Sequence, residues 1–409
     1  MSRQVAEVIV AGHICLDIIP AMDEKQSGMS DLLVPGKLVN IGPAVISTGG
    51  AVSNTGIALH RLGSQVKLMG KIGKDPFGEA ILAHLRQQDE SLVEGMILTP
   101  GEHSSYSIVI SPPHTDRAFL HATGANDTYS AADVTTEQLE GARLFHFGYP
   151  PLMRSMYEHN GSELTRMLKQ VKACGLTVSL DMAKPDPESD AGKADWIAIL
   201  ADALPYVDIF MPSFEEVLYM LNRERFHQLE KEAPSGDLLS LATGALLSEL
   251  STQLLDMGAA IVVIKLGEHG LYVRTTWDEG RLSAMGRCNP SPSTLKEWLG
   301  CEFITSCFEA EVKGTTGAGD CTIAGFLFSL LKGTSIEEAI HTAVGVGACN
   351  VEQPDATSGI PPWSDVVSRI ERGWAKRKMN LDLTEWSINE QQLWIGPHDK
   401  WYRTGRDAE

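Results

Sequence analysis

Short apolar runs of strand length alternate with helical patterns along most of the chain. Six runs are rich in β-branched or bulky apolar residues, and each has the length of a buried strand: EVIVAG, VKLMGKIG, LFHFGYP, LTVSLDMA, VDIFMPS and AAIVVIKLG. Helical patterns separate them at residues 77–88, 163–173, 196–204, 214–221 and 242–257. Strand–helix–strand order predicts parallel pairing through right-handed crossovers. The chain is therefore expected to form a three-layer α/β/α sandwich around a mostly parallel sheet.

Two segments break this rhythm because neither adjoins a clear helix. Residues 104–123 contain two short strands joined by a Pro-Pro turn, which predicts a β-hairpin. Residues 36–48 are also strand-like, and residues 14–20 continue the end of the first strand. Together these segments predict a small accessory sheet. Ligands of open α/β sheets bind at the carboxyl ends of the strands, so a sheet standing over those ends would form a lid.

The rest of the chain indicates one large domain with additions. Residues 221–237 and 275–300 are polar or rich in turn residues, and they read as insertions. Residues 375–409 are polar and contain tryptophan, and we expect them to lie over a finished domain. We therefore place the main domain at residues 1–374 and a C-terminal extension after it.

Composition limits the partners that the chain can have. The net charge is −19, which argues against binding along a nucleic acid, because a phosphate backbone needs a basic face. No apolar run approaches the ~20 residues needed to span a bilayer, so no membrane partner is expected. The seven cysteines are odd in number and form no CxxC pair, which favours reduced thiols in a cytoplasmic protein.

The stretch GTTGAGD has almost no side chains before its final carboxylate, Asp320. Gly317, Ala318 and Gly319 leave their backbone N–H groups accessible, and a helical apolar pattern follows up to Gly333. Such a loop at a helix N-terminus is an anion site. Asp320 then has two interpretations. It is either a favourable first-turn residue or a general base beside an anion hole, as phosphoryl transfer requires.

Two other nucleotide-binding motifs fit less well. GxxxxGK[ST] does not occur, so the chain is not a P-loop NTPase. Gly317-x-Gly319-x-x-Thr322 lacks the third glycine of GxGxxG and lies late in the chain, whereas a dinucleotide fold usually begins with that motif. A dehydrogenase therefore stays an outside alternative.

A second glycine-rich stretch is GGAVSN. Its paired glycines, Gly49 and Gly50, permit a tight turn and close backbone approach. Asn54 begins the following helix, where it is either an N-cap or an amide that binds a sugar hydroxyl. Upstream, Asp17 leaves the first apolar strand at its carboxyl end, where a carboxylate can accept hydrogen bonds from vicinal hydroxyls.

These motifs occur in the order found in a known family. GHICLDI resembles the first strand of the pfkB-type carbohydrate kinases, GGAVSN and GKIGKDPFGE resemble their N-terminal signature, DRAFLHATGAN their lid strand, and GTTGAGDCTIAGF their C-terminal signature. The resemblance covers about residues 8–365. It implies a ribokinase-like fold with a β-sheet lid and an ATP-dependent phosphotransferase, so residues 1–374 would be the kinase domain.

The resemblance also implies roles for the matching positions. Asp320 would be the catalytic base, and the N–H groups of Gly317, Ala318 and Gly319 the anion hole. The sugar would be held by Asp17, Gly49, Gly50 and Asn54. The nucleotide would be contacted by Ser213, Lys265, Gly267, Gly270, Thr316, Gly319, Ala343 and Gly347. Glu216 would organise Mg²⁺ through water, which makes ATP and Mg²⁺ the expected cofactors. By residue type alone, Glu216 is equally consistent with a first-turn helix carboxylate.

The chain departs from the family pattern at three places. Ser213 stands where asparagine is frequent, so its phosphate or water contacts are expected to differ. Gly314 replaces an aspartate that helps to hold a monovalent cation in some members, which puts activation by potassium in doubt. FHFGYPPLM lacks the acidic residue that some members use on the sugar.

We expect the acceptor to be a primary hydroxyl of a small sugar. GGAVSN has no lysine at its third position, which favours an unphosphorylated sugar or a nucleoside over a sugar phosphate. Arg117 and Arg154 could still bind a phosphate, and Tyr106 could either stack on a base or pack the lid. The alternative from another class is a non-catalytic sugar- or nucleotide-binding protein. A homodimer through the lid would cover the exposed strand edges.

Overall fold

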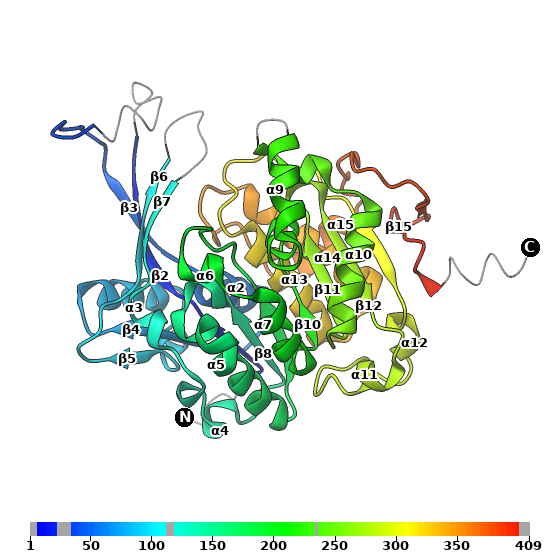
Figure 1. Ribbon diagram of the computed structural model, residues 1–409, viewed down its shortest axis with the longest axis horizontal. Coiled ribbons are helices and arrows are strands. Elements are labelled where there is room, and N and C mark those ends of the chain that lie inside the picture. Colours follow the sequence, from blue (N-terminus) through cyan, green and yellow to red (C-terminus); the bar gives the residue numbers. More distant parts are fainter. Residues whose placement is uncertain (1–5, 23–33, 112–117, 234–235, 401–409) are drawn as a thin grey trace, which may run out of the picture.

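The computed structural model describes residues 6–22, 34–111, 118–233 and 236–400 (Figure 1). Its central sheet has eleven strands in the order β14-β15-β13-β12-β11-β10-β9-β8-β1-β4-β5. The parallel part comprises β5 (Ile97–Thr99), β4 (Val66–Gly73), β1 (Val8–Gly12), β8 (Leu144–Gly148), β9 (Thr177–Asp181), β10 (Ile209–Phe210) and β11 (Ile261–Lys265). The antiparallel part comprises β12 (Leu271–Thr275), β13 (Glu302–Thr305), β15 (Trp394–Ile395) and β14 (Ser387–Ile388).

The side chains of β1 point alternately into two cores, one on each face of the sheet. Val8 and Val10 belong to one core, and Ile9 and Ala11 belong to the other. All four side chains are fully buried. Because both faces are covered, the strand has a continuous apolar sequence instead of an alternating one. The expected α/β/α sandwich around a mostly parallel sheet is confirmed.

Helices cover both faces of the sheet. One face carries α2 (Ala51–Leu62), α3 (Pro76–Gln88), α13 (Ala318–Lys332), α14 (Ile336–Val351) and α15 (Trp363–Glu371). The other carries α5 (Arg154–Ala173), α7 (Trp196–Ala203), α8 (Phe214–Leu221), α9 (Arg223–Glu232) and α10 (Gly244–Asp256). Four helices are short: α4 (Thr136–Leu139), α6 (Asp190–Lys193), α11 (Glu279–Ser283) and α12 (Leu295–Trp298). Within the described ranges, no helix combines the length and the hydropathy that crossing a membrane would need.

The helices agree with the sequence patterns at most boundaries, and α5 is the main difference. The pattern predicted a helix from residue 163, but α5 begins at Arg154. Left-handed backbone at His159, Asn160 and Gly161 interrupts it, with φ between 53° and 69°. The predicted helix is thus the part after the interruption, because a kinked segment breaks the 3.6-residue period.

The accessory sheet is present and projects from the body as a blue and cyan blade (Figure 1). In spatial order its strands are β3 (Ala44–Gly49), β2 (Cys15–Pro20), β6 (Tyr106–Ile110) and β7 (Ala118–Ala122). We call these four strands the lid. β6 and β7 form the expected antiparallel hairpin, and its Pro-Pro turn lies outside the described residues. The register pairs Asp17 with Ser107 and Ser107 with His121, so these side chains share one face of the lid.

Residues 275–300 are less of a surface excursion than their composition suggested. Leu282, Met285 and Trp298 are each at most 1% exposed. The Trp298 ring meets the ring of Phe326 in α13 edge-on, with 6.2 Å between the centroids. A few widely spaced apolar side chains therefore anchor this segment in the core. Such spacing produces no periodic signal in the sequence.

The residues after 375 complete the edge of the central sheet instead of lying over it. β15 pairs with β13, and β14 pairs with β15. The buried carboxylate of Asp399 accepts a hydrogen bond from the Glu302 backbone N–H at 3.0 Å. Strands of two residues are too short to show alternation, so no pattern marked them. The domain boundary at residue 374 stays a prediction.

Candidate active site

Asp320 lies in the first turn of α13, and residues from distant parts of the chain hold its carboxylate. Asn54 Nδ2 donates to Oδ2 at 3.0 Å, and Thr55 Oγ1 donates to Oδ1 at 3.3 Å. The hydroxyl of Tyr149, just after β8, is 2.9 Å from both oxygens. Asp320 is only 4% exposed, and burial raises its pKa although these hydrogen bonds oppose the shift. The carboxylate is thus fixed in position and has an increased affinity for a proton.

The turn before Asp320 requires glycine at position 317, whereas position 319 leaves room for a Cβ. Gly317 has φ +73°, in the left-handed region that favours glycine, and a Cβ there would lie 2.8 Å from the Cβ of Ala356. At Gly319, the nearest neighbour of an added Cβ would be Lys265 Cδ at 3.4 Å. The first N–H groups of a helix have no acceptor within the helix, so this loop presents donors to a ligand. The geometry suits an anion beside the carboxylate.

Lys265, at the end of β11, lies among acidic side chains. Its ammonium group forms an ion pair with Asp181 at the end of β9, and the two side chains are 13% and 1% exposed. Burial alone would lower the pKa of Lys265, but the charges of Asp181, Glu216 and Asp320 raise it above its ordinary value. Burial raises the pKa of Asp181 to about 8 and also raises that of Glu216. The ammonium group of Lys265 is therefore paired with one carboxylate and shares the central cavity with two more, those of Glu216 and Asp320.

Ser213 and Glu216 form a capping box at the start of α8. Glu216 accepts from the Ser213 backbone N–H at 2.6 Å, and Ser213 Oγ accepts from the Glu216 N–H at 3.3 Å. The contacts of Glu216 are therefore those of a first-turn helix carboxylate, which was one of its two interpretations. Glu216 also lines the same cavity as Asp320, so a second role towards a bound ion is sterically open to it.

The donors around Lys265 suit a hard divalent cation that keeps most of its water. The described residues hold no ready group of three or more His, Cys, Asp or Glu ligands. Asp181 Oδ2 is buried and, among those residues, has no hydrogen-bond partner. Mg²⁺ usually binds one or two carboxylates together with waters and phosphate oxygens. Asp181 and Glu216 therefore fit Mg²⁺ that arrives with a nucleotide.

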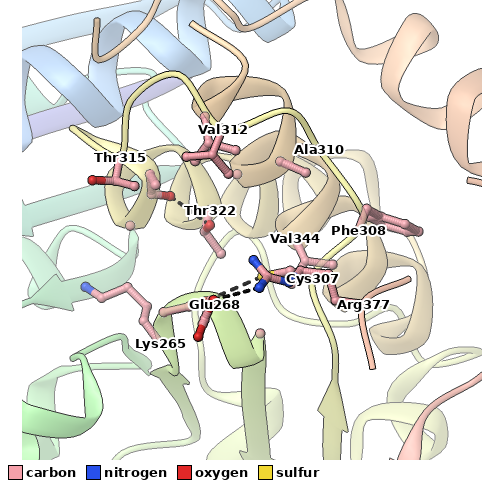
Figure 2. Close-up of a pocket in the computed structure, with 17 residues that line it drawn as sticks. Lys265, Glu268, Cys307, Phe308, Ala310, Val312, Thr315, Thr322, Val344 and Arg377 are labelled. Atoms are coloured by element: carbon pink, nitrogen blue, oxygen red, sulfur yellow. Dashed lines mark hydrogen bonds and ion pairs between the residues drawn. The ribbon is translucent and has the colours of Figure 1, made fainter. Parts of the chain in front are cut away.

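Three cavities meet around the Asp320 loop. The first, of about 400 Å³, lies between the turn at 267–270 and α14 (Figure 2). The central cavity, of about 320 Å³, contains Asp320 and Tyr149. The lid cavity, of about 380 Å³, lies between the lid and the loop before α13 and contains Asp17. Thr315 lines all three, so ligands in the first cavity and under the lid would meet near Asp320.

Comparison with known proteins identifies the family. Residues 5–363 match the pfkB family carbohydrate kinases. The chain belongs to this family. The family and the enzyme class expected from the ordered motifs are confirmed, and the protein is a carbohydrate kinase. The family implies ATP as the phosphoryl donor and Mg²⁺ as its companion ion.

Individual relatives of this pfkB kinase are distant. A 2-dehydro-3-deoxygluconokinase of Bacillus subtilis is 24% identical over 325 residues, which cover 78% of this chain and 85% of the relative. A fructokinase of Vibrio alginolyticus is 24% identical over 371 residues, covering 89% and 99%. An Arabidopsis thaliana ribokinase complexed with ribose and ATP superposes with a TM-score of 0.65 at 18% identity, covering 89% and 98%. At this identity the superposition shows the fold.

The predicted nucleotide positions of this pfkB kinase are distributed over the three cavities. The first cavity is lined by Lys265, Gly267, Gly270, Gly319 and Gly347. Ser213 lines the central cavity, and Thr316 lines the lid cavity. Ala343 instead packs against Gly325 of α13. Its neighbour Val344 faces the first cavity, because residues 344, 347, 348 and 351 share one face of α14.

Asp17 of the kinase lies within β2, in the stretch 14–20 that was expected to contribute to the lid, and a break after Gly12 separates β2 from β1. Its carboxylate accepts a hydrogen bond from the Cys15 thiol at 3.3 Å. A Cβ at Gly49 would overlap the Asp17 carboxylate. Gly50 has φ +87°, so both glycines of GGAVSN have a steric reason. Gly49 makes room for Asp17, and Gly50 turns the chain into α2.

Tyr106 is not brought to the lid cavity. Its ring packs on Phe77 of α3, with 5.1 Å between the centroids. Asp17 and Ser107 share one face of the lid, and successive strand residues alternate, so Tyr106 points to the opposite face. Tyr106 was considered either to stack on a base or to pack the lid, and its contact with Phe77 is one of lid packing.

Some residues of the site were not found from the sequence. Tyr149 lies in FHFGYPPLM, which was noted only for lacking an acid. His13 and His121 link the body to the lid, with 3.3 Å between their Nε2 atoms. Asp181 carried a usable signal, because it ends an apolar strand at the carboxyl edge where ligands bind.

Proposed function

We propose that this kinase transfers the γ-phosphoryl group of ATP to a hydroxyl, expected to be primary, of a small sugar. The position of Asp320 supports this most directly. Its carboxylate sits in the first turn of α13 beside the small-residue loop, and it lines the central cavity. A base next to an anion site is the arrangement that phosphoryl transfer to an alcohol needs.

In the proposed reaction, Asp320 accepts the proton of the acceptor hydroxyl as its oxygen attacks the γ-phosphorus. The bond between phosphorus and the β–γ bridging oxygen breaks, and ADP leaves. Backbone N–H groups at Gly317, Ala318 and Gly319 stabilise charge on the transferring group. The Ala318 N–H contacts the Thr315 carbonyl oxygen at 3.3 Å, so it would exchange that partner for the phosphoryl oxygen. Mg²⁺, when bound near Asp181 and Glu216, would neutralise phosphate charge.

Asp17 and Asn54 are the proposed sugar ligands. Asn54 Nδ2 is occupied by Asp320, and its Oδ1 is buried without a hydrogen-bond partner in the described ranges. That oxygen and the Asp17 carboxylate can accept from sugar hydroxyls. The relatives named fructokinase and 2-dehydro-3-deoxygluconokinase also support a small sugar as the acceptor.

A sugar phosphate is the second candidate acceptor. Lys313 lines the lid cavity together with Asp17, and an ammonium group there suits a substrate phosphate. Arg117, the other cation considered for this purpose within the lid, lies outside the described residues. A nucleoside is the third candidate acceptor.

ADP release with a panel of acceptors tests the proposal. Neutral sugars, sugar acids, sugar phosphates and nucleosides would each be offered with ATP and Mg²⁺. We expect turnover with at least one unphosphorylated sugar. Turnover limited to sugar phosphates would select the second candidate. ADP release that stays at the acceptor-free background with every class would contradict the proposed reaction.

Replacing Tyr149 by phenylalanine is expected to raise the pKa of Asp320. The Tyr149 hydroxyl donates to the carboxylate and stabilises its charged form. The acid limb of the kcat/KM profile should therefore move up by about one to two pH units. Tyr206→Phe is the control, because Tyr206 is partly buried beside Lys169, at the amino end of β10 and not at the carboxyl ends where the site lies. An acid limb that stays in place in Tyr149→Phe would show that Tyr149 does not tune the base.

We expect turnover without activation by potassium. A Cβ at Gly314 would lie 2.8 Å from the Pro354 carbonyl oxygen, so this backbone has no space for the aspartate that some family members carry there. ADP release would be measured in potassium, sodium and tetramethylammonium chloride at equal ionic strength. Rates should agree in all three salts, and a severalfold increase in potassium alone would overturn this expectation.

We propose that two copies of the kinase pair through their lids. The outer strands of the lid, β3 and β7, expose Val45, Ile46, Phe119 and Leu120 by 51–60%. Pairing would cover these side chains and the strand edges. Sedimentation at working concentration should show a dimer, and the double variant Ile46→Asp, Leu120→Asp should sediment as a monomer. A monomeric parent chain would remove the proposal.

A further inference from the structure

The C-terminal segment returns to the body beside the first cavity. Residues 374–377, which we call the strap, pair antiparallel with residues 307–309 through a bridge between Lys376 and Phe308. The Glu309 N–H donates to the Ala375 carbonyl oxygen at 2.8 Å, and the Arg377 N–H donates to the Cys307 carbonyl oxygen at 2.8 Å. The strap therefore fixes the backbone at residue 377 next to the cavity wall.

Aromatic contacts hold the strap in this position. The Trp374 ring stacks on the ring of Phe308 with 4.7 Å between centroids, and the Arg369 guanidinium lies 3.5 Å from the Trp374 centroid. Trp374 Nε1 donates to the Glu309 carbonyl oxygen at 2.7 Å. Phe308 itself lines the first cavity. Most of the strap is thus packed or hydrogen-bonded, and its placement does not depend on the side chain of Arg377.

The Arg377 side chain lines the first cavity and pairs with Glu268, which lines it too (Figure 2). Among the described residues, the charged side chains that line this cavity are Lys265, Glu268 and Arg377. Lys265 lies at the end shared with the central cavity and is paired with Asp181. Of the first and central cavities, Arg377 lines only the first, whereas Asp320 lines the central one. A guanidinium here would meet the nucleoside end of a bound nucleotide and not its γ-phosphate.

The pair between Arg377 and Glu268 is easily exchanged. Arg377 Nη2 is 2.7 Å from Glu268 Oε2, and the side chains are 43% and 59% exposed. Exposed pairs of this kind contribute little to stability, so a ligand can take over the guanidinium at small cost. A guanidinium is flat and can stack on a planar base as well as donate hydrogen bonds.

We propose that Arg377 is a nucleotide-binding residue supplied by the C-terminal strap. On binding, its guanidinium leaves Glu268 and contacts the base or ribose of the nucleotide. This inference rests on the proposed kinase function, because it takes the first cavity to be the nucleoside site. It adds a binding residue beyond residue 363, where the family match ends.

Direct binding measurements test the proposal without turnover. Dissociation constants for ATP, ADP and adenosine would be measured by calorimetry on the full chain. Arg377→Ala is expected to weaken all three by about fivefold to thirtyfold. The equal loss for adenosine is the signature of a nucleoside contact, since adenosine carries no phosphate. Arg372→Ala is the matched control, because Arg372 lies at the exposed end of α15, where its Nε donates to the Ser368 carbonyl oxygen of its own helix turn.

Glu268→Gln separates a binding role from a structural one. If Glu268 competes for Arg377, this variant should tighten adenosine binding by up to about fivefold. If the pair only braces the fold, both variants should weaken binding together and lower the unfolding midpoint. The tightening should vanish in the double variant Arg377→Ala, Glu268→Gln, because the released guanidinium is then absent.

Three results would overturn the inference. The first is a set of dissociation constants for Arg377→Ala within twofold of the parent chain. The second is a loss for ATP and ADP but not for adenosine, which would place the contact on phosphate. The third is weaker binding in Glu268→Gln. Failure of the parent chain to bind ATP at all would instead overturn the kinase proposal together with this one, so the two failures are distinguishable.

Discussion

Replacing Asp320 by asparagine is expected to lower turnover by about 10²- to 10⁴-fold while ATP and sugar still bind. An amide cannot take the proton of the acceptor hydroxyl at neutral pH. The side chain keeps its shape, so its contacts with Thr55 and Tyr149 can persist in part. Because burial disfavours the charged carboxylate, we expect the variant to unfold at the same temperature or higher. The measurements are ADP release, nucleotide binding and thermal unfolding.

The matched control is Asp365→Asn. Asp365 also lies in the first turn of a helix, α15, but at an exposed position. If Asp320 were only a favourable first-turn residue, the two variants would behave alike and turnover would be retained in both. Loss of turnover in Asp320→Asn alone supports the base. Turnover near the parent value in Asp320→Asn would remove the proposed role.

The pH dependence gives an independent measure of the same carboxylate. A base must be deprotonated to act, so turnover should fall as the pH drops through the pKa of Asp320. Burial raises that pKa, and the acid limb should therefore lie above the ordinary range of an aspartate. The residual activity of Asp320→Asn should show no such limb.

The second large effect is expected for Lys265→Met, which should destabilise the protein by about 3–5 kcal/mol. The side chain of Lys265 is 13% exposed and that of Asp181 is 1% exposed, so the variant leaves a buried carboxylate without its cation. The negative charges of Glu216 and Asp320 also act on Asp181, and without Lys265 their repulsion of its carboxylate is no longer offset. Denaturant unfolding at pH 8 measures the loss, and ADP release should fall at the same time.

Acid should partly rescue this variant. The pKa of Asp181 is raised to about 8 by burial, against a much lower value in the unfolded chain. When the pKa of a carboxyl group is higher in the folded than in the unfolded state, the folded protein loses stability as the pH rises from the unfolded-state pKa to the folded-state pKa. Stability of Lys265→Met should therefore increase as the pH is lowered from 8 towards 5. A loss that stays constant over this range would show that the carboxylates are not the cause.

Lys172→Met is the control for a buried ion pair outside the site. Lys172 pairs with Asp208, which precedes β10 and is also bonded by Arg281. Since Arg281 remains, the stability loss should be smaller than in Lys265→Met. Turnover of the folded protein should be kept, because Asp208 lies at the amino end of its strand and the site lies at the carboxyl ends.

Much of the fold was predictable because a strand that is buried on both faces of a sheet has a continuous apolar sequence. VIVAG and IVVIK are continuous apolar runs, and each became a central strand. GTTGAGD was equally readable, because only small residues fit the left-handed turn at Gly317. Residues 14–20 were expected to continue the first strand into the lid, and Asp17 does lie in the lid, but β1 ends at Gly12 and β2 is a separate strand. A two-residue break between β1 and β2 is too short for the sequence to show where one strand ends and the next begins.

The sequence by itself determined the sandwich, the lid, the family and the loop that carries Asp320, because each depends on residues that are neighbours along the chain. Only the tertiary structure decided that Tyr149 donates to Asp320 across 171 positions, that Asp181 and Lys265 pair across 84, and that the strap brings Arg377 to Glu268 across 109. Contacts between residues so far apart produce no period and no motif. They arise when the sheet sets its strand order and brings the carboxyl ends together.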